Sequence, residues 1–359
     1  MTPTQTSAPQ TELTHLIIYA NAICNAHCLM CDVGRESDIG IARPLVGAPR
    51  YMSLALLEKL LDDPLVTERT PRCNVYFVMT EPLLTPHLPE MLRAAKERGH
   101  AVFLTTNGLL LEKRAAEIAP YIDNIQISLD GPEAVHDAIR GPGFFRAALK
   151  GLQAIRALRP DVELVINTTI FNRTAPTLTE LASILDDLGV RIDMFKVQGL
   201  DYVSGPMQAR HNACYPKIEQ SASTEGDVLD FDAIDFDDLA RQLSELRDWK
   251  PRNIDSIGFK PPFTSADELR SYYTENGDKH ESWHTCLTPF VAMAVNTAGE
   301  CFFHIRCFNG YQLGNASTQP LAAIFHGHKA NDFRRQLTES DFCFPACTRC
   351  CGVNPVDRV

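Results

Sequence analysis

The sequence is short of positive charge, since its 359 residues include 34 lysines and arginines against 45 aspartates and glutamates. The formal net charge of −11 argues against nucleic acid or an anionic membrane surface as a partner, because both require a basic surface. No stretch approaches the roughly 18 consecutive apolar residues of a membrane-spanning helix. Residues 1–10 are polar and lack the charged and apolar regions of a secretory signal. These absences favour a cytoplasmic enzyme.

Cysteine, in contrast, is abundant, with 12 residues in the chain. In a reducing compartment this usage indicates metal or redox chemistry rather than disulfides. Cys24, Cys28 and Cys31 form a C-x3-C-x2-C run directly after the apolar residues 16–19. Three thiolates are one ligand short of the set that closes an iron-sulfur cluster, so one iron stays open for a substrate or cofactor. The alternative, a zinc site, would need a second close pair of ligands, and no such pair follows nearby.

Residues 1–200 alternate between short β-branched runs and amphipathic stretches. Strands are predicted at 16–19, 74–79, 101–105, 124–129, 163–170 and 193–198. Helices are predicted at 53–61, 88–98, 111–119, 144–158 and 177–188. This alternation predicts an α/β fold with a parallel sheet, in which the residues after the carboxyl ends of the strands gather on one rim. The cysteine run follows the first strand and is expected at that rim.

The cysteine run resembles the signature of the radical S-adenosylmethionine (SAM) superfamily. In that family the amine and carboxylate of SAM chelate the open iron, and an injected electron cleaves SAM to a 5'-deoxyadenosyl radical. The resemblance implies a 4Fe-4S cluster on Cys24, Cys28 and Cys31. It also implies a partial (β/α)6 barrel and a reducing partner of flavodoxin or ferredoxin type.

Short motifs at later strand ends extend the resemblance. Residues 79–82 read Met-Thr-Glu-Pro where the family usually has Gly-Gly-Glu-Pro, and Thr-Asn-Gly and Leu-Asp-Gly follow at 106–108 and 129–131. Each tripeptide alone is ordinary turn chemistry, but their order behind the cysteine run argues against coincidence. The missing glycines put the side chains of Met79 and Thr80 where backbone normally lies against SAM.

The resemblance also implies how SAM is bound. Thr80 and Glu81 are expected to hold its amine, and Ser128 and Asn167 to face its ribose or carboxylate. Arg140 is a further expected contact, with a solvated cation at a helix end as the alternative.

The remaining cysteines gather near the C-terminus, namely Cys286, Cys301, Cys307, Cys343, Cys347, Cys350 and Cys351. The pair Cys347 and Cys350 has the spacing of a metal knuckle, which indicates a second metal centre. The frame from Cys286 through Gly299 to Cys350 is similar to the C-terminal auxiliary-cluster domains called SPASM and, in shortened form, twitch. Few residues follow Cys351, so the one-cluster twitch form fits better, and two 4Fe-4S clusters are expected in all.

The sequence does not decide which residue is the fourth ligand of this second cluster. His304 stands where the frame normally has a cysteine, and imidazole can ligate iron-sulfur clusters and raises their potential. Cys307 is a nearly equal candidate. Cys301 ranks third, because alternation along a strand through residues 300–305 places it on the opposite face from His304. A further alternative leaves one iron open and His304 merely nearby. The predicted ligands are therefore Cys286, His304, Cys347 and Cys350.

The expected organisation is a flexible N-terminus at 1–15, a radical SAM barrel at 16–235, a bridge at 236–283 and a SPASM or twitch domain at 284–359. A cysteine left over after both clusters could act in catalysis. Hydrogen abstraction can end in epimerisation, which needs a weak X–H donor such as a thiol, or in oxidation, which needs a base and an electron acceptor. Cys307 and Cys214 are the predicted donors.

The substrate is predicted from what the sequence lacks. Peptide-modifying members often carry a leader-binding domain ahead of the cluster motif, and little chain precedes Cys24 here. A small polar substrate is therefore expected, and the one-cluster form resembles enzymes that tailor carbohydrates and aminocyclitols in antibiotic biosynthesis. We predict an epimerase of a sugar-like substrate, with an alcohol dehydrogenase second and a peptide-modifying enzyme third. A non-catalytic iron-sulfur scaffold or electron-transfer protein is the alternative from a different class.

Overall fold

The computed structural model describes residues 10–31, 47–220, 230–263, 265–274, 286–304, 308 and 310–350. Its centre is a ten-stranded sheet in the order β10-β9-β8-β1-β2-β3-β4-β5-β6-β7. The strands are β1 (His15–Ile18), β2 (Asn74–Phe77), β3 (Ala101–Thr106), β4 (Asn124–Ser128), β5 (Glu163–Ile170), β6 (Met194–Gly199), β7 (Ile257–Lys260), β8 (Ala292–Val295), β9 (Glu300–Phe302) and β10 (Gly314–Asn315). Strands β1 to β7 pair in parallel with their neighbours and β8 runs parallel to β1, whereas β9 and β10 are antiparallel.

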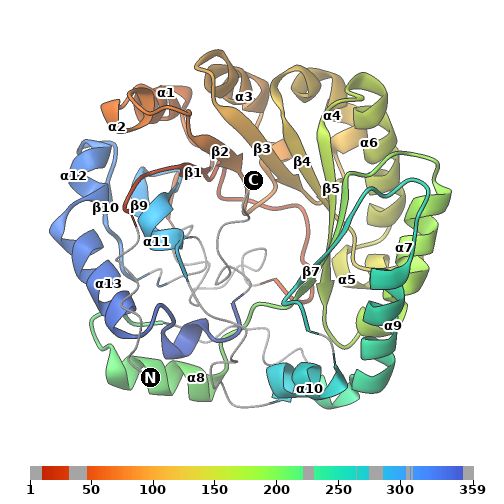
Figure 1. Cartoon of the computed structure of the whole chain (residues 1–359). Coiled ribbons are helices and arrows are strands. Elements are labelled where there is room, and N and C mark those ends of the chain that lie inside the picture. Colours follow the sequence, from red (N-terminus) through yellow and green to blue (C-terminus); the bar gives the residue numbers. More distant parts are fainter. Residues whose placement is uncertain are drawn as a thin grey trace.

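The sheet curves into an arch, and most helices lie along its convex side (Figure 1). The α-helices are α1 (Leu54–Leu61), α2 (Pro64–Thr67), α3 (Leu88–Glu97), α4 (Leu111–Ile118), α5 (Glu133–Arg140), α6 (Phe144–Leu158), α7 (Leu178–Asp187), α8 (Gly205–Cys214), α9 (Phe236–Asp248), α10 (Ala266–Thr274), α11 (Thr288–Val291), α12 (Leu321–Phe325) and α13 (His328–Glu339). We call the side of the sheet that faces the centre of the arch the concave face. The arch is the partial barrel that the family resemblance implies.

Alternation along the strands separates the two faces of the sheet. Val75 and Phe77 of β2, like Phe195 and Val197 of β6, are buried in the large core between sheet and helices. The residues between them point to the concave face, because successive side chains of a strand alternate. Burial of this convex layer is what holds the arch together.

The predicted α/β fold is confirmed, and each of the six predicted strands is present within two residues of its expected ends. Two features differ from the prediction. Residues 254–259 were expected in a connection, yet β7 extends the sheet as a further parallel strand beside β6. The strand expected through residues 300–305 ends at Phe302, so alternation from Cys301 does not reach His304. Both differences come from pairing with distant strands, which local sequence pattern does not encode.

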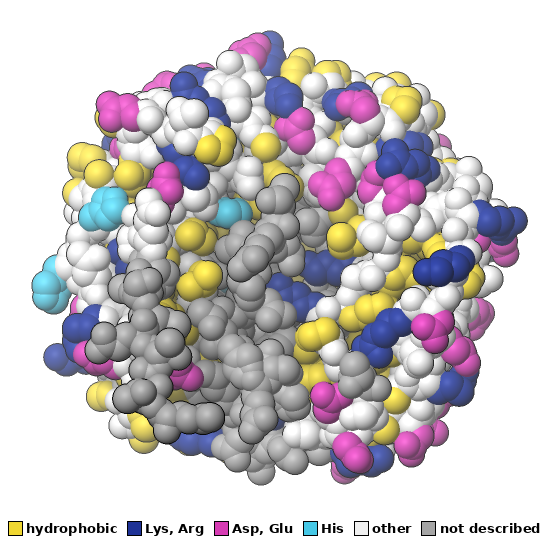
Figure 2. Space-filling view, viewed as in Figure 1, with side chains coloured by type: hydrophobic (Ala, Val, Ile, Leu, Met, Phe, Trp, Pro, Cys, Tyr) yellow, Lys and Arg dark blue, Asp and Glu magenta, His cyan; other side chains and the backbone are white. Residues whose placement is uncertain are grey.

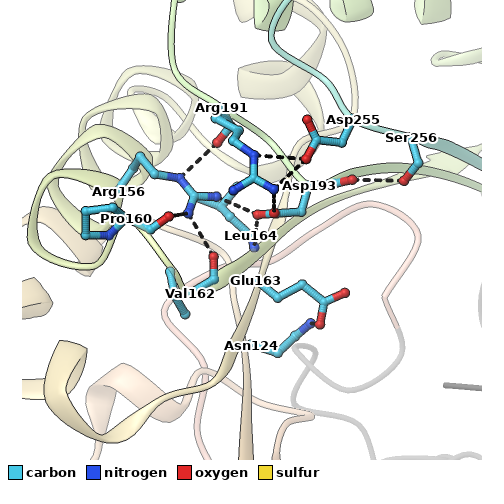
Figure 3. Close-up of polar contacts among 10 residues, drawn as sticks. All are labelled: Asn124, Arg156, Pro160, Val162, Glu163, Leu164, Arg191, Asp193, Asp255 and Ser256. Atoms are coloured by element: carbon cyan, nitrogen blue, oxygen red, sulfur yellow. Dashed lines mark hydrogen bonds and ion pairs between the residues drawn. The ribbon is translucent and has the colours of Figure 1, made fainter.

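Charged residues tie together the amino ends of β4, β5 and β6 (Figure 3). Arg156 Nη2 pairs with Asp193 Oδ2 at 2.5 Å, and Arg191 bridges Asp193 and Asp255. Asn124 donates to Glu163 at 2.8 Å in the same region. This edge is opposite the cysteine run and serves to hold the strands in place. No helix within the described ranges is both long enough and apolar enough to cross a membrane.

Candidate functional site

The three cysteines of the N-terminal run lie in the loop after β1, at the carboxyl edge of the sheet. Cys28 is buried, whereas Cys24 and Cys31 are half-buried. The loop packs in a small apolar cluster of its own, with Ile139 and Phe171 among its members. The predicted position at the rim is therefore observed.

These thiols influence one another electrostatically. Burial raises the pKa of Cys24 to about 12, and the negative charges of Glu81, Cys28 and Cys31 add to the increase. Burial also raises the pKa of Cys28. Thiols placed in this way resist ionisation unless a metal supplies compensating positive charge. The donor set thus fits an iron-sulfur cluster.

Arg140 supplies positive charge beside the same loop. It is the last residue of α5, and its Nη1 donates to Cys28 Sγ at 3.6 Å while its Nε pairs with Asp130 Oδ2 at 2.6 Å. Burial acts to lower the pKa of Arg140, but the charges of Asp130 and Cys28 outweigh it and keep the pKa above the usual value. The alternative that Arg140 is a solvated cation at a helix end is wrong, because its side chain is only 12% exposed.

Asp130 and His136 hold Arg140 in this position, and sequence reasoning gave neither of them a role. The carboxylate of the fully buried Asp130 accepts from the Thr169 amide at 2.9 Å as well as from Arg140. The Asp130 amide donates to His136 Nδ1 at 3.0 Å. The only sequence signal for this chain of contacts was an acidic residue just past β4, followed by a histidine in the next helix.

Glu81 is a structural link as well as a predicted SAM contact. Its Oε1 accepts from the Leu83 amide at 3.0 Å and from Thr106 Oγ1 at 2.8 Å, and its Oε2 accepts from the Asn107 amide at 2.8 Å. Burial raises the pKa of Glu81 to about 7 despite these donors. Glu81 therefore ties the end of β3 to the second motif.

Met79 keeps the backbone conformation of the glycine that the resemblance leads one to expect there. Its φ is +96°, in the left-handed region that side chains rarely adopt. Next to it, Thr80 Oγ1 donates to Asn21 Oδ1 at 2.7 Å. The Thr80 hydroxyl is thus engaged within the protein, although its backbone stays beside the cysteine loop through the bond from the Glu81 amide to the Ile23 carbonyl at 3.2 Å.

Ser128 and Asn167 are neighbours across β4 and β5. Asn167 Nδ2 donates to Gln126 Oε1 at 2.8 Å, whereas Asn167 Oδ1 is buried and accepts no hydrogen bond from the described residues. A buried acceptor without a partner costs free energy unless a ligand donates to it. A ribose hydroxyl of SAM would satisfy it, so this part of the site fits the predicted cofactor.

Three of the four predicted auxiliary ligands line one small cavity, namely Cys286, His304 and Cys347. Phe308, Phe333 and Phe344 also line it. Burial, together with the charges of Cys350 and Cys343, raises the pKa of Cys286 to about 12. Cys350 is therefore near Cys286, and so is Cys343, which the sequence did not assign as a ligand.

The other cysteines considered as ligands of the second cluster do not line this cavity or are not among the described residues. Cys301 is buried in β9, with its thiol against the Gly299 carbonyl at 3.5 Å. Cys307 and Cys351 lie outside the described residues. No group of three or more ligand-type side chains in the described ranges is arranged to hold a single metal ion. A cluster differs from an ion in this respect, because its iron and sulfide atoms separate the thiolates.

Cys214, the other predicted hydrogen donor, is the last residue of α8 and is exposed. Helix α8 packs against the short 3-10 helix η7 (Pro345–Cys347). The thiol is thus on the solvent side of the helix end. This position does not favour contact with a bound substrate.

Two sequence families match this chain. Residues 18–183 match the radical SAM superfamily, and residues 286–351 match the iron-sulfur cluster-binding SPASM domain. An AdoMet-dependent heme synthase of Methanosarcina barkeri is 34% identical over 113 residues, which cover 30% of this chain and 32% of that protein. The mycofactocin maturase MftC of Mycobacterium tuberculosis is 27% identical over 52% of this chain and 44% of its own length. This chain therefore spans less than half the length of either relative.

A longer match covers nearly the whole chain. A tungsten-containing aldehyde ferredoxin oxidoreductase cofactor-modifying protein of Pyrococcus furiosus is 22% identical over 94% of this chain and 87% of its own length. Among solved structures, Streptococcus suis SuiB bound to S-adenosylmethionine has the same fold, with a TM-score of 0.62 at 16% identity over 90% of this chain and 68% of SuiB. SAM, a 4Fe-4S cluster and an auxiliary iron-sulfur centre are the cofactors of these domains. The chain thus contains a radical SAM domain over residues 18–183 and a C-terminal SPASM domain over residues 286–351.

Proposed function

We propose that this chain is an enzyme that removes a hydrogen atom from a sugar-like small molecule and returns one to the opposite face of the carbon, as an epimerase does. When bound, SAM and its cluster supply the radical that abstracts hydrogen, and the auxiliary centre exchanges electrons. The protein contributes binding, orientation and a hydrogen donor. A small external reductant of flavodoxin or ferredoxin type provides the electron.

The observation that carries this proposal is the polar half of the concave face. By alternation, Gln126 and Ser128 of β4, Asn167 of β5 and Gln198 of β6 all point to this side. Ser128 and Asn167 are assigned to SAM, and the amides of Gln126 and Gln198 suit a substrate rich in hydroxyl groups.

The concave face is apolar toward β1, β8 and the neighbouring β2 and β3, where the rings of Tyr76 and Phe103 stack on each other. Ile17 and Tyr19 pack there with Ala292, Ala294 and Phe302. The apolar half of the arch thus suits the adenosyl group of SAM or the apolar face of a substrate ring, and the polar half suits the polar groups of the substrate. This division supports a small substrate held beside the cofactor.

The predicted residue roles follow from the site. Cys24, Cys28 and Cys31 hold the first cluster, and Asn167 and Ser128 bind the ribose or carboxylate of SAM. Of the two predicted donors, Cys307 is the better candidate, because the exposed Cys214 is open to solvent. A thiol that quenches a carbon radical must sit where water and oxygen are excluded.

Two other reactions have specific support. A SAM-dependent alcohol dehydrogenase needs an electron acceptor, and the cavity lined by Cys286, His304 and Cys347 offers a place for one. Peptide modification, the third candidate, is supported by the similarity to MftC and to a PqqA peptide cyclase of Streptomyces rochei, which is 30% identical over 35% of this chain.

An anaerobic assay separates these candidates. The full chain with both clusters reconstituted is incubated with SAM, dithionite and a panel of aminocyclitols, glycosides and sugar phosphates in D2O. An epimerase gives 5'-deoxyadenosine and an isomeric product carrying one solvent deuterium. A dehydrogenase gives a product lighter by two hydrogen atoms. If no 5'-deoxyadenosine forms, the enzymatic proposal is contradicted. The variant that lacks Cys24, Cys28 and Cys31 serves as the negative control.

A further inference from the structure

Two lysines lie on the concave face, and neither has a polar partner among the described residues. Lys196 stands in β6 between Phe195 and Val197, both buried in the convex core, so its side chain points to the opposite side. Lys260 is the last residue of β7, where Ile257 and Phe259 contact the convex core. Within the described part of the chain, neither lysine forms a hydrogen bond or an ion pair.

Strand register places the two lysines next to each other. Asn167 pairs with Lys196 across β5 and β6, and Gln198 pairs with Lys260 across β6 and β7. Lys196 and Lys260 are therefore diagonal neighbours on one face, a separation of about 7–8 Å that long side chains span easily. Lys196 is also in line with Asn167 and Ser128, the residues predicted to face SAM.

Two like charges at this distance repel each other and lower stability unless an anion lies between them. At the opposite edge of the sheet the cations are neutralised, as Figure 3 shows for Arg156 and Arg191 with Asp193. In Figure 2, Lys and Arg side chains are visible within the hollow of the face shown. Within the described ranges, Lys196 and Lys260 have no acidic partner of the kind found at the opposite edge of the sheet.

Space for a ligand is present beside Lys196. Its neighbour in β7 is Gly258, which carries no side chain. A Cβ built there would meet no atom closer than Met194 Sδ at 3.5 Å. The Thr169 and Gln198 side chains, on the same face, add neutral hydrogen-bonding groups next to Lys260.

We propose that Lys196 and Lys260 form an anion subsite that binds a phosphate or carboxylate group of the substrate. This inference rests on the proposed function, and it narrows the substrate from a sugar-like molecule to one that is negatively charged. Flexible ammonium groups suit such a group as point charges that adapt to its position. The carboxylate of SAM is the other source of the same chemistry, but it is a single group expected near β4 and β5, whereas Lys260 lies on β7.

The subsite is tested by binding to the full chain with both clusters and SAM in place. Glucose 6-phosphate and glucose are titrated calorimetrically as matched charged and uncharged probes. Glucose 6-phosphate is expected to bind and glucose to bind at least tenfold more weakly, because hydrogen bonds to charged groups are the stronger ones. Lys196→Gln and Lys260→Gln should each weaken binding of the phosphate by about tenfold or more, and added salt should weaken it further.

Lys113→Gln is the matched control, since Lys113 is an exposed lysine on α4. It removes the same charge and should leave binding unchanged. Equal binding of the two sugars, or lysine variants that bind glucose 6-phosphate like the unmodified chain, would overturn the proposal. A loss of SAM affinity in both lysine variants, without any binding of glucose 6-phosphate, would assign the lysines to the SAM carboxylate and overturn it as well.

Failure of the proposed function is measured separately. Uncoupled cleavage of SAM by the dithionite-reduced protein needs no substrate anion, so it reports on the radical chemistry alone. A chain that binds glucose 6-phosphate through the lysines but never cleaves SAM keeps the subsite and loses the enzymatic proposal. A chain that cleaves SAM but shows no preference for the charged sugar keeps the enzymatic proposal and loses the subsite.

Discussion

The guanidinium of Arg140 donates to the sulfur of Cys28 across 3.6 Å, joining the end of α5 to the cysteine loop. The Leu29 amide, next to Cys28, also bonds to the Ile139 carbonyl at 3.1 Å. Two separate contacts therefore dock the loop on α5. A cation hydrogen-bonded to a ligand sulfur raises the potential of an iron-sulfur cluster, because it stabilises the added electron.

Replacement of Arg140 should therefore change the electronic properties of the first cluster before it changes the fold. Arg140→Lys keeps the charge and should leave the reduction potential nearly unchanged, whereas Arg140→Gln should lower it. Spectroelectrochemical titration of the reconstituted protein measures both potentials. Arg140→Gln also leaves the buried Asp130 without its ion pair, at a cost of about 3–5 kcal/mol in unfolding free energy. Equal potentials in the Gln and Lys variants would show that the charge of Arg140 does not act on the cluster.

Removal of the three N-terminal thiols tests the assignment of the first cluster. Replacing Cys24, Cys28 and Cys31 together by Ala should remove about four irons per chain and leave the auxiliary cluster in place, because the two sites draw on separate segments. Iron analysis and the absorption spectrum of the reconstituted variant give the answer. Iron content equal to that of the unmodified chain contradicts the assignment.

Much of the barrel could be predicted because its strands are strongly patterned. β5 has the bounds predicted from sequence, since its residues 163–170 are rich in β-branched types and bury alternate side chains. β7 was missed because Ile257, Gly258, Phe259 and Lys260 carry a weak pattern and become a strand only by pairing with β6. The anion subsite depends on that pairing and was therefore out of reach from sequence.

The candidate site divides in the same way. The cysteines could be assigned from spacing alone, because metal ligands close in sequence remain close in space. The contacts of Asp130 with His136 and Arg140 could not, because they depend on how the turn after β4 packs on α5. Met79 is intermediate: the sequence indicated a missing glycine, and the structure adds that the backbone still has φ of +96°.

The fourth ligand of the auxiliary cluster is a testable choice between His304 and Cys307. If His304 is the ligand, His304→Cys should keep the cluster and lower its potential, because thiolate donates more charge than imidazole. His304→Ala should then lose more iron than Cys307→Ala does. The iron content and reduction potential of these three variants, each with Cys24, Cys28 and Cys31 intact, decide the matter. Bleaching by Cys307→Ala alone would assign the ligand to Cys307.

The hydrogen donor can be identified by single substitutions. Cys214→Ser should leave product yield and stereochemistry unchanged, because the thiol is exposed at the end of α8. Cys307→Ser should keep SAM cleavage but block normal quenching, because a hydroxyl holds its hydrogen too tightly for a carbon radical. The substrate would then recapture hydrogen from 5'-deoxyadenosine or be oxidised. If both variants give unchanged products, neither thiol is the hydrogen donor, and oxidation by a SAM-dependent alcohol dehydrogenase becomes the favoured reaction.

His136 should make stability depend on pH. Burial, together with the charge of Arg140, lowers its pKa to about 4 from an ordinary value of 6.5. Above pH 6.5 the ring is neutral in both folded and unfolded chains, so it contributes no pH dependence. As the pH falls from 6.5 to 4 the unfolded chain takes up a proton that the folded chain does not, and stability is lost.

The full loss from this one group is roughly 3 kcal/mol in unfolding free energy. His136→Asn is the informative variant, because the Asn carbonyl can still accept from the Asp130 amide at the position of Nδ1. It should lower stability at pH 7 modestly and flatten the decline between pH 6.5 and 4. Urea unfolding of both proteins at a series of pH values measures this difference. A decline of the same size in the Asn variant would mean that other groups, and not His136, control acid stability.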